Sequence, residues 1–388
     1  MTAEGAPPGC TERELGRALL ARQHLLAPAE PAVDPGTDVL RVITHLVGLQ
    51  SQAPDPPYVG LWTRLRGFDP QTLGSLLLER RVVRLALLRG TIHLVAAEDA
   101  LVLHALLAPL FAAQLRSNTQ HGKHLAPLDS SELAAAGRAA LADGPLSPAD
   151  LGEVLARRWP GVPPASLAHG VRGLLPLVQV PPRGLWRARG PGTGTRWTTA
   201  ESWLGRDVPV LDDPAERQAA LATLVLRYLA AFGPATVADV QRWSGLTGLG
   251  RVVASIRPLL VAFTGPDGRE HLDVLDGPRP AADECAPVRF LPEWDNLLLG
   301  HARRERVITE ERRRAMFTAN GIVHASVLVD GAVVGRWAVR TAPGSATLEV
   351  HLLDARLSTA QRAEAEAEGV RLLGLVADPA SEHRVVIA

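Results

Sequence analysis

The segment Gly144–Leu151 (GPLSPADL) recurs in altered form at Gly233–Val240 (GPATVADV), and this repeat limits the fold more than any other property of the sequence. In both copies Gly-Pro is suited to end one helix, Ser or Thr to cap the next, and Ala-Asp to open it. A helix–turn–helix pattern follows each copy, and a β-hairpin pattern closes it. The hairpin strands are predicted at residues 175–180 with 185–188 in the first copy, and at 259–263 with 270–274 in the second.

Three helices followed by a hairpin is the order of a winged helix–turn–helix, and a third, more diverged copy lies near the N-terminus. Its helices are predicted at residues 12–25, 38–52 and 70–81, and its hairpin joins 82–88 to 91–95 through Arg89-Gly90. The chain therefore holds three tandem copies of this motif.

After about residue 280 the pattern changes to alternating strands. We predict strands at residues 322–329, 332–339 and 346–353, a helix at 359–369 and a final strand at 371–376. The fold class is α+β, with three tandem winged helix–turn–helix motifs and a β-rich α+β domain at the C-terminus. We expect domains at residues 1–110, 111–206, 207–280 and 281–388.

The composition excludes several classes of protein. The chain is 46% hydrophobic, which is enough to bury a sizeable core and too much for a disordered chain. No apolar run approaches the roughly 18 residues of a membrane span, and residues 1–10 lack the features of a secretory signal. Two cysteines cannot form a disulfide framework or a Cys-rich zinc site. We expect a cytoplasmic monomer with no membrane association, no bound metal and no cofactor.

The basic residues are clustered, although 41 basic and 41 acidic residues cancel in the chain as a whole. Residues 154–200 contain seven arginines and three interleaved tryptophans but no acidic residue, and residues 80–97 contain four arginines and no acidic residue. Clustered cations that can displace phosphate counterions are typical of nucleic-acid binders. The alternative is that they are ordinary solvated wings of an arginine-biased chain. We favour double-stranded DNA as the partner over a protein-interaction role.

Two glutamines lie at the end of the second predicted helix. Gln50 continues the helical stripe of Val39, Ile43 and Leu46, so it occupies a position where an apolar residue is expected. Three prolines follow Gln52 within five residues and favour extended backbone, so the helix is expected to end there. Both amides can then face one cleft. The alternative is that Gln50 caps neighbouring backbone while Gln52 is solvated.

Three segments together resemble one known family: Gly48–Ala53 (GLQSQA), Leu88–Val95 (LRGTIHLV) and Phe290–His301 (FLPEWDNLLLGH). They are similar to the AlkZ/YcaQ family of winged-helix DNA glycosylases, and the resemblance covers nearly the whole chain. The family pattern is Gln-x-(Gln or Asp). Gln50-Ser51-Gln52 is similar to the AlkZ branch, which is associated with bulky N7-alkylated bases and interstrand crosslinks, and differs from the YcaQ branch, which carries Asp at the second position.

The resemblance implies a DNA-repair glycosylase that hydrolyses the N-glycosidic bond of alkylated bases in double-stranded DNA, with Gln50 and Gln52 holding the water. An N7-alkylated purine is already cationic and leaves as a neutral base, so it does not need the acid that sugar hydrolases supply. An amide can accept a hydrogen bond from water and donate another without a net charge. Lys123 is the only lysine and is predicted in a polar loop far from this motif, so no side-chain amine is expected to form a Schiff base, which leaves only the α-amino terminus as an alternative. We therefore expect a monofunctional enzyme that leaves an abasic site.

Other candidate residues are weaker. The first wing offers Arg89, Thr91 and His93 for DNA contact, although His93 also suits a structural hydrogen bond. The candidate DNA contacts of the second wing are Arg183, Arg187, Arg189 and Arg196. Asp295 and Asn296 either line the cleft or cap a helix that begins there, and we favour capping.

A non-catalytic winged-helix regulator is the alternative function. Paired amides at a helix end favour the enzyme, because a regulator does not need them. The predicted recognition helix, residues 163–174, offers only Ser166, His169 and Arg172 for reading bases, which suits binding that does not depend on sequence.

Overall fold

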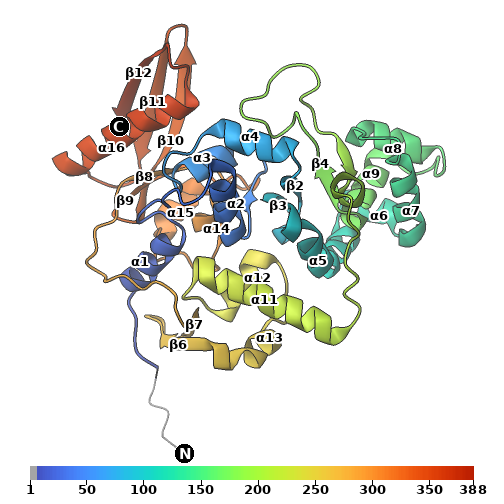
Figure 1. Ribbon diagram of the computed structural model, residues 1–388, viewed down its shortest axis with the longest axis horizontal. Helices are drawn as coiled ribbons and strands as arrows, with labels where there is room; N and C mark the ends of the chain where they lie inside the picture. Colours follow the sequence, from blue (N-terminus) through green and yellow to red (C-terminus); the bar gives the residue numbers. More distant parts are fainter. Residues whose placement is uncertain (1–6) are drawn as a thin grey trace, which may run out of the picture.

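The computed structural model describes residues 7–388; residues 1–6, part of the segment expected not to be a secretory signal, lie outside this range. Figure 1 shows the chain in four groups of elements. The N-terminal elements (blue) lie in the middle, residues 118–204 (green) at one side, residues 214–274 (yellow) below, and the C-terminal sheet with its helix (red) at the opposite side. Helices and β-sheets both contribute, as the α+β prediction requires.

The first group contains the predicted third helix and hairpin at nearly the expected residues. Asp34 and Asp69 cap its second and fourth helices, and each of these helices has Pro at its first position, where the missing N–H costs nothing. The elements are α1 (Glu12–Arg22), α2 (Pro35–His45), β1 (Leu49–Gln50), α3 (Pro56–Trp62), α4 (Pro70–Leu78), β2 (Val82–Ala86), the 3₁₀ turn η1 (Leu88–Gly90), β3 (Ile92–Ala96) and α5 (Ala97–Ser117).

The second group begins with four helices and ends in a strand pair that differs from the prediction. The elements are α6 (Gly122–Leu125), α7 (Ser130–Ala140), α8 (Pro148–Ala156), α9 (Pro164–Leu174), β4 (Leu177–Gln179), β5 (Trp197–Thr199) and α10 (Ala200–Leu204). Residues 185–188, predicted as the second strand, lie in the loop between β4 and β5 instead. They form turns because Arg187 has a φ of 51° and Trp186 packs on Tyr58 of α3, with ring centroids 4.8 Å apart.

The first two groups share one sheet of strand order β1-β3-β2-β4-β5. The two wings meet where Leu85 of β2 pairs with Val178 of β4. The side chains of Val83, Leu85 and Val178 are all buried in the largest hydrophobic cluster. The wing strands of these two groups are therefore joined edge to edge.

The third group matches its prediction closely. Its elements are α11 (Pro214–Phe232), α12 (Val237–Ser244), α13 (Gly250–Ser255), the 3₁₀ turn η2 (Arg257–Leu259), β6 (Leu260–Thr264) and β7 (Glu270–Val274). Thr236 caps α12 in a capping box with Asp239, and Ser147 caps α8 at the equivalent place in the first copy of the repeat. The predicted hairpin is confirmed as the antiparallel pair β6–β7.

The C-terminal group is a five-stranded sheet of order β12-β11-β10-β9-β8 with a long helix. Its elements are β8 (Arg289–Leu291), α14 (Asn296–Leu299), α15 (Glu310–Met316), β9 (Ser326–Val329), β10 (Ala332–Ala342), β11 (Ser345–Leu352), α16 (Thr359–Val376) and β12 (Glu382–Ile387). The predicted final strand at residues 371–376 is wrong. This segment continues α16, because Leu372 and Leu373 extend the buried helical spacing of Ala365 and Gly369, and the last strand is β12.

Among residues 7–388, helix α5 is the one helix long and apolar enough to cross a membrane, although Glu98, Asp99, His104 and Gln114 interrupt its apolar runs. An 18-residue window of this 21-residue helix has a mean hydropathy of 1.4, so by length and composition alone α5 could cross a membrane. Several of its side chains, including Leu103, Leu106, Leu107 and Phe111, are buried among the wing strands and α11. This burial is what a core helix requires.

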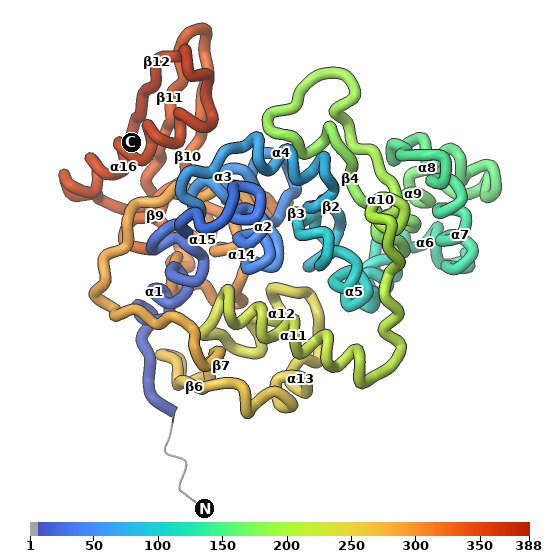
Figure 2. The backbone as a smooth tube through the Cα atoms, viewed as in Figure 1, coloured from blue at the N-terminus to red at the C-terminus, as the bar shows by residue number. Residues whose placement is uncertain are grey.

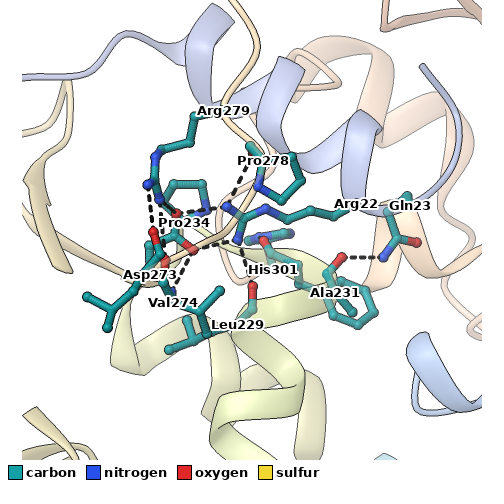
Figure 3. A network of polar contacts seen from close by, with 12 residues as sticks. Arg22, Gln23, Leu229, Ala231, Pro234, Asp273, Val274, Pro278, Arg279 and His301 are labelled. Carbon is teal, nitrogen blue, oxygen red and sulfur yellow. Dashed lines mark hydrogen bonds and ion pairs between the residues drawn. The ribbon is translucent and has the colours of Figure 1, made fainter. Parts of the chain in front are cut away.

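Helix α1 connects the beginning of the chain to the third group, as the backbone trace in Figure 2 shows. The Arg22 guanidinium lies against Asp273 of β7, with Nη1–Oδ1 and Nη2–Oδ2 distances of 2.5 and 2.7 Å, and both side chains are fully buried. Gln23 Nε2 donates to the Ala231 carbonyl at 2.6 Å, and Arg279 reaches the same carboxylate from outside (Figure 3). The N-terminal helix is therefore held by polar contacts with residues more than 200 positions later.

Candidate functional site

The predicted helix at residues 38–52 ends early, and this places Gln50 in a strand. Helix α2 stops at His45, Gly48 turns the chain with a φ of 96°, and Leu49–Gln50 form β1. A Cβ atom on residue 48 would lie 2.5 Å from Val95 Cγ1 and 2.8 Å from the Leu94 carbonyl oxygen, so only glycine fits. The Gln-Ser-Gln motif therefore runs along the edge of the first wing.

The first wing holds each residue of the motif. Gln50 pairs with His93 in the β-ladder, and its Oε1 accepts from Arg89 Nη2 at 2.8 Å. Ser51 donates its N–H to the Ile92 carbonyl at 2.7 Å. The Oε1 atom of Gln52 accepts from the Ile92 N–H at 3.3 Å. Gln50 is buried and Gln52 is exposed, so the motif passes from the interior to the surface.

Arg84, on β2 and separated from β1 by β3, holds the middle of the motif. Its Nε and Nη2 donate to Ser51 Oγ and to the Ser51 carbonyl, both at 2.8 Å. The side chain is 1% exposed, and burial together with the nearby charge of Arg183 lowers the Arg84 pKa to about 10. Arg84 therefore remains charged at neutral pH and makes charge-assisted contacts with the motif.

The wing-tip residues predicted to contact DNA are turned inward to different degrees. Arg89, with a φ of 56°, donates to the Trp243 carbonyl of α12 as well as to Gln50, and burial lowers its pKa to about 10. Thr91 is half-buried and donates to the Leu88 carbonyl within the turn. His93 is 2% exposed, its Nδ1 lies 3.0 Å from the Thr91 carbonyl, and burial lowers its pKa to about 3. The geometry matches the structural interpretation of His93, and contact of these residues with DNA stays a prediction.

The arginines of the second wing lie in the long loop between β4 and β5, which rises beside α4 in Figure 1. Arg183 is half-buried, whereas Arg187, Arg189 and Arg196 are exposed. Arg189 Nη2 lies 2.7 Å from Asp55 Oδ2, three residues after Gln52. Arg196 instead donates to the Pro145 carbonyl at 2.5 Å. The structure thus brings Arg189 close to the segment that follows the motif, and Arg196 to the start of the repeat.

Asp295 and Asn296 support the motif from behind. Asp295 caps α14 by accepting from the Leu297 N–H at 2.9 Å, as the capping interpretation predicts. It also pairs with both Nη atoms of Arg64 at 2.8 and 2.7 Å, with both side chains fully buried. Asn296 Nδ2 donates to the Gly48 carbonyl at 2.8 Å, at the turn that starts β1. Both residues are buried, so they position the turn and do not line an open cleft.

The family follows from this motif together with the comparisons. A family model described as "DNA glycosylase AlkZ-like" matches residues 43–375. The chain belongs to the AlkZ-like DNA glycosylase family. The resemblance noted from the three sequence segments is therefore confirmed.

Two relatives extend the match over most of this AlkZ-like chain. It is 25% identical over 333 residues to an "Interstrand DNA cross-link repair glycosylase" of Streptomyces sahachiroi, covering 80% of this chain and 84% of the relative. Its fold is similar to that of the solved DNA glycosylase AlkZ from Streptomyces sahachiroi, with a TM-score of 0.76, 20% identity, and coverage of 98% of this chain and 100% of the other.

Sequence reasoning missed Arg84, Ser51 and Arg64 in this AlkZ-like protein. One signal was available, because Arg84 is the only charged residue in the apolar run of residues 82–88. A buried charge in a strand needs partners, and Ser51 supplies two acceptors. The partner of Arg64 lies 231 residues away, so no local pattern could reveal that pair.

A cavity of about 420 Å³ opens at Asp55 and Pro56, just after the motif, between the second-wing loop and the C-terminal sheet. Its lining combines Trp186 and Trp337 with Arg187, Arg189 and Glu293. Burial raises the pKa of the Glu293 carboxyl. Over residues 7–388 we find no group of three or more His, Cys, Asp or Glu side chains placed to hold a metal ion.

Proposed function

We propose that this AlkZ-like glycosylase is monofunctional, hydrolyses the N-glycosidic bond of N7-alkylated purines in double-stranded DNA, and leaves an abasic site. The observation that carries the proposal is the anchored Gln50-Ser51-Gln52 motif. Its two amides are fixed by Arg89 and by the Ile92 N–H, and Gln52 is exposed to solvent. Bulky adducts and interstrand crosslinks are the proposed lesions.

The amides suit a reaction in which a positive charge develops on the sugar. Each glutamine Oε1 accepts one protein hydrogen bond and keeps a second acceptor site for a water molecule. Fixed dipoles aimed at developing charge stabilise a transition state without reorganising. We assign this role to Gln50 and Gln52 jointly, with the water held between them and the sugar.

The surrounding carboxylates favour a leaving group that needs no acid. Asp55 is engaged by Arg189, and Asp295 is enclosed in its pair with Arg64. Glu293, whose pKa burial raises, lines the cavity next to Asp55 and makes no hydrogen bond with either glutamine among the described residues. In the described part of the chain, the hydrogen bonds of the two glutamine side chains are to Arg89 and Ile92 and include no carboxylic acid. A cationic N7-alkylated purine can depart under these conditions, whereas a neutral, undamaged purine needs protonation. This difference would spare normal DNA.

The single lysine supports hydrolysis without strand cleavage. Lys123 is exposed on the short helix α6, not in the loop expected from the sequence, and α6 packs against α5 and α9. A lyase step needs an amine that forms a Schiff base at the reacting sugar. The wing strands that hold the motif contain no lysine.

Crosslinked lesions favour a site at the surface. A base tied to the opposite strand cannot be flipped far into a closed pocket. Gln52 is exposed at the edge of the sheet, where a damaged nucleotide can approach without full extrusion.

The test is single-turnover release of an N7-alkylguanine from duplex DNA by the wild type, Gln50→Ala and Gln52→Ala. We expect alkali-dependent strand breaks with the wild type and a loss of about 100-fold or more in each variant, the size seen when a positioned dipole is removed from an active site. A duplex with a crosslink tests the second lesion class. Tight binding with no abasic product on either substrate would instead favour the non-catalytic regulator.

A further inference from the structure

A second cavity, of about 490 Å³, lies between the tip of the first wing, the end of α5 and the middle of α9. Arg89 and Gly90 form its wing side, Gln114 and Asn118 its α5 side, and Arg172 belongs to its α9 side. The remaining lining residues are Ala86, Phe111, Leu115, Ser117, Thr119, His169 and Gly173. It is therefore a junction of the first two winged-helix groups.

The cavity and the Gln-Ser-Gln motif share one residue. The Arg89 guanidinium donates to Gln50, whereas the Arg89 carbonyl accepts from Gln114 Nε2 at 3.0 Å on the cavity side. Arg172 Nη2 reaches the Gly90 carbonyl at 3.4 Å. A ligand in this cavity would thus lie next to the residue that holds a catalytic amide.

The charge of the cavity favours an anion. Arg89 and Arg172 line it, and no residue of its lining, all within the described range, is acidic. Within residues 7–388 their guanidiniums donate to oxygens of Trp243, Gln50 and Gly90 and to no carboxylate. Burial lowers the pKa of Arg172, and burial together with the charges of Arg242 and Arg304 lowers that of Arg89.

The neighbouring polar groups are hydrogen-bond donors. Asn118 Oδ1 accepts from the N–H groups of Gln120 and His121 at 3.0 and 2.7 Å, so its Nδ2 is a donor, and it donates to His169 Nε2 at 3.5 Å. Burial and the charges of His121 and Arg172 lower the His169 pKa to about 4. At neutral pH the ring is uncharged and can donate a single hydrogen bond.

We propose that this cavity binds a backbone phosphate of the DNA strand that flanks the lesion, with Arg172 as the charged contact. This inference rests on the proposed function, because it takes duplex DNA as the ligand. α9 is the second helix of a helix–turn–helix, the element that usually faces DNA. A phosphate contact carries no sequence information but fixes the register of the duplex, and here it would set which sugar meets Gln50 and Gln52.

The test is binding of a fluorescein-labelled, undamaged duplex by the full chain, measured by anisotropy over a range of salt concentrations. In Arg172→Gln we expect the slope of log affinity against log salt concentration to fall by about 0.9, the value for one phosphate contact. In Asn118→Asp the carboxylate can keep both acceptor bonds to Gln120 and His121 while it adds a negative charge to the cavity. We expect about a tenfold weaker affinity at low salt, the size of one lost charge-assisted contact, with a smaller difference at high salt.

Gln361→Glu is the matched control. Gln361 Oε1 accepts from the Ser358 N–H at 3.0 Å in the capping box of α16, and a glutamate keeps this bond while adding the same charge far from the cavity. We expect its affinity and salt slope to equal those of the wild type. If Asn118→Asp and Arg172→Gln have the same affinity and salt slope as this control, the proposed phosphate site is wrong. If Arg172→Gln does not fold, the affinity of folded Asn118→Asp decides the question alone.

The outcome is separable from that of the glycosylase assay, because undamaged DNA requires no excision. If both variants bind DNA more weakly and the wild type releases no base, the phosphate site is supported and the proposed glycosylase activity is wrong. If the wild type releases the base and both variants bind DNA with unchanged affinity, only the proposed phosphate site is wrong.

Discussion

Arg84 shows how one residue fixes the geometry of the candidate site. A guanidinium has donors in a rigid fork, so Nε and Nη2 can reach the hydroxyl and the carbonyl of Ser51 at the same time. Ser51 lies between the two glutamines, and its position sets the direction of both neighbouring side chains. Arg84 is therefore a positioning residue, and we place no atom of it on the substrate.

We expect Arg84→Lys to keep the positive charge but to lose the two guanidinium donors that reach Ser51 together. One ammonium group cannot reproduce both contacts, so we expect about a tenfold lower single-turnover rate and a destabilisation of about 1–3 kcal/mol. Arg81→Lys is the control, because Arg81 is exposed and makes no side-chain hydrogen bond among the described residues. Equal single-turnover rates and equal melting temperatures for the two variants would show that the paired contacts of Arg84 with Ser51 do not contribute to activity or stability.

The glutamines could be identified from the sequence, but their surroundings could not. Gln50 stood out because it interrupts an apolar stripe, and the family resemblance added Gln52. The partners Arg84, Arg89 and Ile92 lie 33 to 40 residues away, and only the pairing of β1 with β3 brings them to the motif. Local patterns carry no information about such pairing.

Among the elements, the turn between α2 and β1 determines whether the motif is helical or extended. The apolar stripe alone favours a helix through Gln50, yet Val47 and Gly48 both take positive φ, and the helix ends at His45, five residues before Gln50. Extended backbone then lets Ser51 and Gln52 bond to Ile92. In a helix the Ser51 N–H would bond within the helix, and the motif would not be attached to the wing through it.

We expect Gly48→Ala to damage both stability and activity, because Ala adds a clash with Val95 to the cost of a positive φ. Gly67→Ala separates the two effects, since Gly67 has a φ of 70° with nothing within 4 Å of its Cβ position. By urea unfolding, Gly67→Ala should lose about 1 kcal/mol and Gly48→Ala more than about 2 kcal/mol. If the two variants lose similar unfolding free energy and Gly48→Ala releases the base at the normal rate, the close approach of residue 48 to Val95 is contradicted.

Elements were predicted well where signals were local. The caps Ser147 and Thr236 and the β6–β7 hairpin follow from nearby residues. Two errors came from short segments interpreted without their packing. Residues 185–188 pack on α3 in place of forming a strand, and residues 371–376 complete α16.

At the scale of the whole molecule, the largest hydrophobic cluster is not confined to one of the four groups of elements. It includes Leu19 of α1, Val178 of β4, Tyr228 of α11 and Val333 of β10, all buried. The predicted domain boundaries stay a prediction, but this cluster shows that the groups share apolar surface. We expect the candidate site, which lies among them, to be sensitive to the stability of the whole chain.

Three buried histidines make that stability depend on pH. Burial is the main cause of the lowered pKa in each case, to about 3 for His93 and about 4 for His104, and below the ordinary value for His301. In the folded chain these rings stay neutral below pH 6.5, where an unfolded chain takes up protons. Stability is therefore complete above about pH 6.5 and falls as pH decreases toward 4.

Each neutral histidine should contribute up to about 1.4 kcal/mol per pH unit to the slope of unfolding free energy in this window. We expect His104→Gln to reduce the slope between pH 6.5 and 4.5, measured by urea unfolding. His351→Gln, at an exposed position, is the control and should give the wild-type slope. Parallel curves for the wild type and His104→Gln would contradict the assignment.

Helix α1 carries a consequence for the order of events during translation. Arg22 and Gln23 leave the ribosome early, but Asp273 and Ala231, which bind them in Figure 3, are synthesised more than 200 residues later. The partner of Arg17, Asp330, is synthesised later still. Until then the nascent chain carries charged groups that have no low-energy place inside a folded intermediate. Helix α1 is therefore synthesised more than 200 residues before its partners and can reach its native position only after them.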